Sequence, residues 1–242
     1  MVDLNPKLKN SGIIDCKPQI GKCPNGCNQC FYNREGAFYT DVDKSQLPTI
    51  EEVGDQIVRV NSGHDSNIDK EKVLEETKKY KHKFYNTSIA DFNFPSPFVW
   101  TANPEEEEMP LFIPNLPNNL MFIRLRVSST NLYFIEEAVK YYSIFLKIPI
   151  VLTFMAYYSK EPENKEQYKW EVRHINSYWC PKKEFMRNVL HRIKTIGSRL
   201  VTMCGTLDSR YCEECGNCKR YYFQTLKHIN ETNLKKGEKN GK

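Results

Sequence analysis

The chain has 242 residues, 40% hydrophobic and 27% charged, and this length suits one sizeable domain rather than two independent cores. No stretch approaches about twenty uninterrupted apolar residues and the N-terminus lacks the regions of a signal peptide, so we expect a cytoplasmic protein without membrane spans. The net charge of +5 is too modest to require a nucleic-acid partner. Nine cysteines, most of them in two tight groups, indicate metal or cluster ligation in a reducing compartment.

The first half of the chain alternates between short apolar runs and charged amphipathic stretches. In chain order, these patterns predict a strand at 11–16, a helix that begins near 49, a strand at 57–60, a helix at 70–83 and a strand at 84–89. Asp69 is a candidate N-cap for the second of the two helices.

Residues 91–118 interrupt this rhythm with several prolines and the run Glu105–Glu108, which predict a long loop, an insertion or a lid. The pattern then resumes with a strand at 120–127, a helix at 132–146, a strand at 149–157, a helix at 181–196 and a strand at 199–204. The alternation of strands with helices predicts an α/β fold with a parallel sheet and helical crossovers. Functional residues are then expected at the carboxyl ends of the strands.

Three cysteines stand close together in the loop after the first predicted strand. Cys23, Cys27 and Cys30 have the spacing Cys-x3-Cys-x2-Cys, in a segment that Pro24 and Gly26 keep from forming regular helix. Three thiolates hold three irons of a 4Fe-4S cube and leave the fourth iron open. The pattern therefore favours an enzyme that does chemistry at the open iron over a protein that only transfers electrons.

This spacing, placed after a first strand and followed by alternating strands and helices, resembles the radical S-adenosylmethionine (radical SAM) superfamily. The resemblance implies a partial (β/α)6 barrel, a 4Fe-4S cluster on Cys23, Cys27 and Cys30, and S-adenosylmethionine chelated at the open iron. It further implies reductive cleavage of this cofactor to a 5′-deoxyadenosyl radical that abstracts hydrogen from a substrate. The electron would come from a reductase, a flavodoxin or a ferredoxin. The sequence does not identify the substrate.

The resemblance also places candidate cofactor-binding residues in the first part of the chain. The family usually has an aromatic residue near the adenine, just before the third cysteine; this chain has Gln29 there, and Phe31, just after Cys30, is our candidate. Gly63 and Asp65 follow the second strand, where the family commonly carries a Gly-Gly-Glu-like turn that receives the amino group of the cofactor. An ordinary strand-to-helix turn is the alternative interpretation of this segment.

Polar residues after the strand at 120–127 are implied to meet the ribose and the carboxylate of the cofactor. Ser128 is the candidate in this position. Arg124 and Arg126 are expected to alternate outward and inward, and the inward one, which we take to be Arg126, could pair with the carboxylate through two hydrogen bonds. Either arginine could instead be a surface residue or part of an ion pair that packs a helix.

A second group of cysteines lies near the C-terminus, at Cys212, Cys215 and Cys218, and Cys204 ends the last predicted strand. The spacing Cys-x2-Cys-x2-Cys is that of the opening of a bacterial ferredoxin run, and Cys204 would supply a fourth thiolate to an auxiliary 4Fe-4S cluster. Zinc is the competing occupant, because it also accepts four thiolates and would pin a terminal loop. The spacing excludes neither metal.

These patterns lead to two functional hypotheses. The first is a radical SAM enzyme with a barrel over residues 1–205, a cysteine-rich extension at 206–228 and a flexible basic tail at 229–242. The second is a zinc-stabilised binding module, for example for nucleic acid, in which both cysteine groups are structural. Iron and sulfide in anaerobically purified protein favour the first hypothesis, and stoichiometric zinc in colourless protein favours the second.

Overall fold

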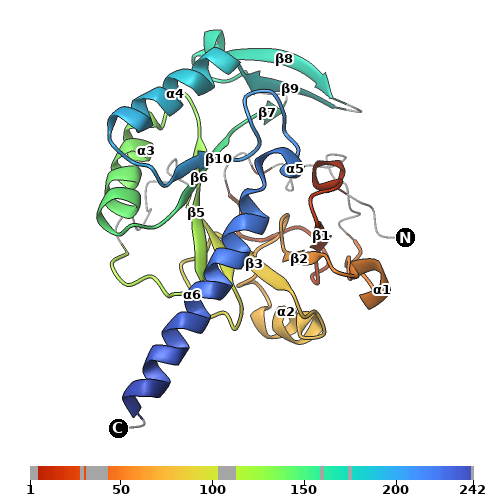
Figure 1. The fold of residues 1–242 in the computed structure, drawn as a ribbon. Coiled ribbons are helices and arrows are strands. Elements are labelled where there is room, and N and C mark those ends of the chain that lie inside the picture. The colour runs from red at the N-terminus through yellow and green to blue at the C-terminus, as the bar shows by residue number, and fades with distance from the viewer. Residues whose placement is uncertain are drawn as a thin grey trace.

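A parallel sheet forms the centre of the molecule (Figure 1). The computed structural model describes residues 5–27, 30, 43–102, 113–158, 161–173 and 176–240. These residues form a seven-stranded sheet in the order β1-β2-β3-β4-β5-β6-β10, and all its neighbouring strands are parallel. The strands are β1 (Ile13–Cys16), β2 (Ile57–Val60), β3 (Lys83–Thr87), β4 (Phe98–Ala102), β5 (Leu120–Val127), β6 (Ile150–Phe154) and β10 (Val201–Met203). The expected α/β class is confirmed, and the sheet is open between its edges β1 and β10.

One face of the sheet packs against a layer of helices. Side chains alternate along each strand, so that Ile14, Val58 and Leu125 join this core. The helices that contribute buried apolar residues to it are α1 (Ile50–Val53), α2 (Lys70–Thr77), α3 (Leu132–Ala138), the π-helical turn η3 (Val139–Phe145) that continues it, and α4 (Lys183–Thr195). Helix α1 starts with a capping box, in which the Thr49 hydroxyl accepts from the Glu52 N–H at 3.2 Å.

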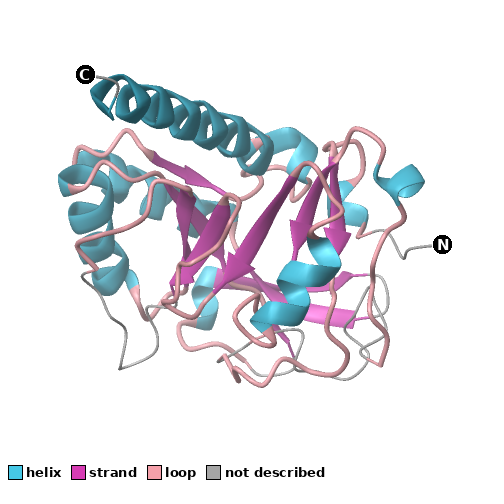
Figure 2. Cartoon of the chain, turned by 90° about the horizontal axis from the view of Figure 1, so that it is seen from below, coloured by secondary structure: helices cyan, strands magenta, loops and turns pink. Residues whose placement is uncertain are grey.

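The other face, which we call the inner face, changes from apolar to polar along the strands. Its first row is apolar, and helix α6 (Asn217–Asn240) covers this row through Tyr221 on Phe122 and Tyr222 on Phe84. Figure 2 shows α6 on one side of the strands. Two residues further towards the carboxyl end of each of these strands, the same face carries a polar side chain: Asp15, Arg59, Asn86, Thr101, Arg124 and Thr153. The inner face therefore carries a polar strip next to the apolar row that α6 covers, and its Asp15, Arg59 and Asn86 side chains are buried.

The C-terminal segment differs from the sequence expectation. We expected a flexible tail over residues 229–242, whereas α6 continues to Asn240. A one-turn helix, α5 (Cys212–Cys215), precedes it and contacts the short 3-10 helix η1 (Pro6–Leu8) before β1. Burial of one face on the sheet accounts for the first part of α6, up to Thr225, whereas Leu234 in the second part is 69% exposed.

Strand β4 lies inside the segment that we expected to be a loop, and the expectation for residues 98–102 is wrong. The connections on both sides of β4 lack a crossover helix among the described residues, so the strand–helix alternation could not reveal it. Aromatic side chains fill the place of the first helix. Phe92 stacks on Phe98 with ring centroids 5.4 Å apart, and Phe94 stacks on Tyr85 at 5.1 Å. A β-rich segment can therefore enter a parallel sheet when loop side chains bury its face.

Phe94→Ala is expected to lower the free energy of unfolding by about 3 kcal/mol, because Phe94 is buried against Tyr85 and Phe98 and its removal leaves a cavity. Phe145→Ala is the matched control: Phe145 is 74% exposed, and we expect a loss below about 1 kcal/mol. Urea unfolding followed by circular dichroism measures both variants. Equal losses would contradict the role of the aromatic loop.

A second, antiparallel sheet lies between β6 and α4, where the strand predicted at 149–157 reaches only Tyr157 and no other strand was predicted. It has the order β7-β9-β8, with β7 (Tyr157–Tyr158), β8 (Tyr168–Arg173) and β9 (Asn176–Pro181), and a short 3-10 helix η4 (Lys165–Gln167) precedes β8. Trp170 and Trp179 pair across β8 and β9 with ring centroids 5.4 Å apart. Within the described ranges, no helix combines the length and apolar character that crossing a membrane requires.

Candidate metal centre

The loop that carries the first three cysteines leaves and re-enters the fold at the carboxyl end of β1. Lys17 follows β1 directly and pairs with Gln46 as an antiparallel bridge, with backbone hydrogen bonds of 2.8 and 2.7 Å. This bridge closes the base of the loop between residues 18 and 45. The sequence prediction that the cysteine loop opens at the carboxyl end of the first strand is therefore confirmed.

The loop extends over the ends of the two neighbouring strands. Asn25 Nδ2 donates to Ser88 Oγ at 2.6 Å and to Cys27 Sγ at 3.3 Å, and Ser88 follows β3. The pKa of the Cys23 thiol is raised by burial, while backbone hydrogen bonds with Asn25 and Asp65 lower it and place this thiol beside the turn after β2. The Cys30 N–H donates to the Cys27 carbonyl at 3.1 Å. Three half-buried thiols thus occur on one loop over the ends of β1, β2 and β3.

The described residues hold no ready-made metal geometry: no three of their His, Cys, Asp or Glu side chains are arranged so that they could hold an ion. Donor chemistry and location nevertheless fit a cluster, because the thiols are partly accessible, share one loop and receive hydrogen bonds of the kind that tune iron–sulfur centres. Ligation has to draw the thiols together, as it does in many proteins whose metal site forms on binding.

Asp65 organises the turn after β2, and its carboxylate is fully occupied. Oδ1 accepts from Thr87 Oγ1 at 2.8 Å and from the Asn67 N–H at 2.9 Å, and Oδ2 accepts from the N–H and the hydroxyl of Ser88 at 2.6 and 2.8 Å. A carboxylate has about four acceptor positions. These bonds tie the β2 and β3 ends together under the cysteine loop. The cofactor contact assigned to Asp65 or the carbonyls around it stays a prediction.

Asp65→Asn is expected to lower the free energy of unfolding by about 3 kcal/mol. Asparagine replaces one carboxylate oxygen with an NH2 group, and at either oxygen position this NH2 group would face a buried hydrogen-bond donor instead of accepting from it. Asp91→Asn is the control, since Asp91 is an exposed partner of Lys70 and its loss should change the free energy by less than about 1 kcal/mol. Urea denaturation curves decide the comparison. A loss for Asp65→Asn as small as the control's would show that the four bonds contribute little.

Sequence reasoning missed a set of buried acceptors near these strand ends. Within the described residues, Gln19 Oε1 and Asn61 Oδ1 are buried without a hydrogen-bond partner, as is Thr153 Oγ1 on β6. The Gln19 amide is held against the β2 turn, where its Nε2 donates to the carbonyls of Asp65 and Ile68 at 3.0 and 2.8 Å. Buried polar atoms without partners are costly, which makes these oxygens candidates for contact with a ligand's donor groups. Amide residues in loops give no such signal in sequence.

The other predicted cofactor-binding residues differ in burial and in location. Gly63 is half-buried in the turn after β2, and the left-handed backbone of that turn is at Asn61, with φ 60°, rather than at the glycine. Ser128 is buried at the end of β5, where its hydroxyl bonds to Thr130 Oγ1 at 3.0 Å within a local turn. Phe31 lies outside the described residues. The cofactor contacts assigned to Gly63, Ser128 and Phe31 stay predictions.

Arg124 and Arg126 share one face of β5, so the expectation that they alternate between faces is wrong. Residues two apart on a strand point the same way, and Leu125 between them joins the core on the helical side. Arg124 donates to Asn86 Oδ1 at 3.2 Å and to Thr101 Oγ1 at 3.3 Å, and Arg126 Nε donates to Met155 Sδ at 3.1 Å. Both guanidinium groups therefore belong to the inner face, with Arg126 nearer the carboxyl end.

The second cysteine group lies on the inner face of the sheet. Cys212 and Cys218 are buried with the apolar residues under α6, Cys215 is half-buried, and Cys204 is exposed directly after β10.

No family model matches this chain, and no curated protein or solved structure matches it. The functional interpretation therefore depends on the residues and on their geometry.

Proposed function

We propose that this protein is an enzyme of radical SAM type, which reductively cleaves S-adenosylmethionine at a 4Fe-4S cluster bound by Cys23, Cys27 and Cys30. The observation that carries the proposal is the placement of these thiols on one loop over the carboxyl ends of β1, β2 and β3 of a parallel sheet. When bound, the cluster and the cofactor would supply a 5′-deoxyadenosyl radical for hydrogen abstraction from the substrate. The open parallel sheet agrees with a partial barrel.

The residues of this chain would hold and orient the cofactor at the same end of the sheet. Asn25 and Ser88 fix the cysteine loop against β3, and Asp65 fixes the β2 turn beneath it. The acceptor oxygens of Gln19 and Asn61 are available near that turn for an ammonium group. Arg126, near the carboxyl end of β5, would receive a carboxylate of the cofactor.

The polar strip of the inner face is the proposed substrate surface. Asn86, Thr101 and Arg124 form a connected set of hydrogen bonds on it, beyond the apolar row that α6 covers. A substrate there would lie between the floor of the sheet and the cysteine loop. Polar groups in fixed positions are suited to orienting a substrate atom towards a reacting centre.

The proposal is tested with protein that is purified anaerobically and reconstituted with iron and sulfide. We expect iron and sulfide bound to the protein and 5′-deoxyadenosine formed from S-adenosylmethionine when dithionite supplies electrons. Zinc in place of iron at the N-terminal cysteines, or no cleavage by protein that is fully loaded with iron, would contradict the proposal.

A further inference from the structure

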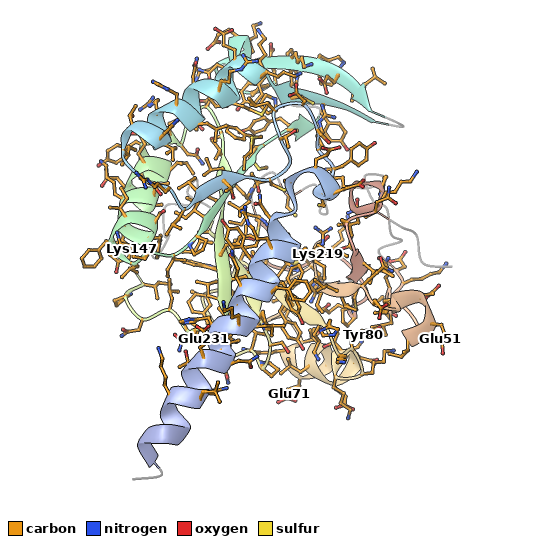
Figure 3. All side chains as sticks on the ribbon, in the orientation of Figure 1. Glu51, Glu71, Tyr80, Lys147, Lys219 and Glu231 are labelled. Atoms are coloured by element: carbon orange, nitrogen blue, oxygen red, sulfur yellow. The ribbon has the colours of Figure 1, made fainter. Side chains whose placement is uncertain are left out.

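The second cysteine group lies where the sheet is open. Cys204 follows the edge strand β10, while α5, which contains Cys212 and Cys215, contacts η1 beside the opposite edge strand β1. The start of α6 approaches the same edge: a Cβ added at Gly12, just before β1, would meet Lys219 Nζ at 3.3 Å. Figure 3 labels Lys219 on the part of α6 nearest α5. The cysteine-rich segment therefore spans the gap between the two edges.

A tight turn brings the chain back from Cys204 towards the other cysteines. Gly205 has φ +75°, and a Cβ at this position would lie 2.5 Å from the Ser209 carbonyl oxygen, so only glycine fits. The Thr206 N–H donates to that same carbonyl at 2.7 Å. At the far end, Asn217 Nδ2 donates to the Met203 carbonyl of β10 at 2.7 Å and holds the first turn of α6 beside the strand. These contacts hold Cys204 and the first turn of α6, which carries Cys218, beside the end of β10.

Positive charge faces these thiols from the floor of the inner face. Burial raises the pKa of the Cys218 thiol to about 12, and the charges of Arg124 and Arg59 act on it in the opposite direction. Burial also raises the pKa of the Cys212 thiol, again opposed by Arg59. Arg59 is partly compensated by Asp15, whereas Arg124 donates to the neutral groups of Asn86 and Thr101. The environment therefore offers counter-charge to a buried anion.

We propose that Cys204, Cys212, Cys215 and Cys218 bind a 4Fe-4S cluster that bridges the open edges of the sheet and fixes α6 over the inner face. A cluster with four thiolate ligands is a net anion, which matches the guanidinium groups beneath it. Because no three of these thiols are yet arranged to hold a metal ion, ligation draws α5 and the first turn of α6 onto β10. The cluster thus acts as a clasp, and its binding does not depend on the N-terminal cysteines.

The ligand arrangement favours iron–sulfur over zinc. Structural zinc sites are commonly built from separated pairs of ligands, such as Cys-x2-Cys followed by a second pair. Here three cysteines occur in a continuous Cys-x2-Cys-x2-Cys run and the fourth comes from a separate strand end, which is the division found when cysteines hold a cubane.

The test uses the full chain with Cys23, Cys27 and Cys30 replaced by alanine, so that only the second group can bind a cluster. After anaerobic reconstitution, this variant is expected to hold about four iron and four sulfide per chain. Adding Cys212→Ser and Cys218→Ser should remove this iron, whereas adding Cys180→Ser, at a buried cysteine of β9 outside both groups, should not. One zinc per chain, or iron that survives Cys212→Ser and Cys218→Ser, would overturn the assignment.

Hydrogen exchange tests the clasp itself. Removal of iron from the triple-alanine variant with a chelator is expected to speed exchange in the first half of α6 at least tenfold, while α2, on the other face of the sheet, keeps its rates. Chelation acts on protein that has already folded, so the result does not depend on whether the cysteine variants fold. Unchanged exchange in α6 would show that the cluster does not hold this helix.

Discussion

Cys27→Ala is expected to lower the rate of 5′-deoxyadenosine formation by at least about 100-fold, because it removes one of three ligands of the proposed cluster, and even outer-shell partners of metal sites change activity by about 10–100-fold. Cys27 is the best of the three positions to replace, since its sulfur accepts from Asn25 and contacts Ser88 at the end of β3. The measurement is anaerobic turnover of S-adenosylmethionine with dithionite, with the product quantified by chromatography.

Cys180→Ala is the matched control for this variant. Cys180 is likewise a thiol, but it is buried in β9, donates to the Tyr178 carbonyl at 3.6 Å and belongs to neither cysteine group. We expect the control to retain its rate within about twofold, and circular dichroism should show both variants folded. Full activity in Cys27→Ala would mean that the cluster is held elsewhere.

Arg59→Leu is expected to lower the free energy of unfolding by about 4 kcal/mol, because it leaves the buried Asp15 carboxylate without its cation. Arg59 Nε donates to Asp15 Oδ1 at 2.6 Å and Nη2 to Oδ2 at 3.1 Å, a two-point pair across β1 and β2. Burial lowers the pKa of Arg59, but the adjacent Asp15 charge more than offsets this and the pKa is raised overall. The Arg59 guanidinium is therefore charged in the native protein at neutral pH.

The double variant Asp15→Leu/Arg59→Leu separates the pair from the packing around it. It should recover most of the loss seen in Arg59→Leu, because replacing both buried charges by apolar groups is often neutral or stabilising. Urea unfolding of the two single variants and the double variant completes the thermodynamic cycle. If the two single losses add in the double variant, the charges are independent and the inner-face ion pair is not a unit.

The regular strands could be predicted because their apolar runs are short and bounded by turn residues. β1, β2, β5 and β6 were found from such runs, and the parallel sheet followed from their alternation with helices. β4 was not predicted because its segment contains several prolines and reads as a loop. The connection before it buries Phe92 and Phe94 on the sheet instead of forming a crossover helix. The antiparallel strands β7 to β9 were not predicted either. The strand predicted at 149–157 merged β6 with Tyr157 of β7, and no run of apolar residues bounded by turns marked β8 or β9.

The candidate site was predictable only where its residues are close in sequence. The cysteine spacing identified Cys23, Cys27 and Cys30 as one group, and their loop does lie at the end of β1. The partners of Asp65 come from residues that the sheet brings next to it across β2 and β3, which no local pattern contains. The same holds for Arg59, whose position beneath Cys212 and Cys218 depends on the path of the C-terminal segment.

Binding of S-adenosylmethionine to the open iron is the central claim, and electron paramagnetic resonance tests it most directly. The variant with Cys212 and Cys218 replaced by serine keeps only the N-terminal cluster in this account, so its reduced spectrum reports that cluster alone. Titration with S-adenosylmethionine is expected to change this spectrum and to saturate near one equivalent per cluster. A reduced cluster whose spectrum is unaffected by the cofactor, or a variant that contains no iron, would contradict the account.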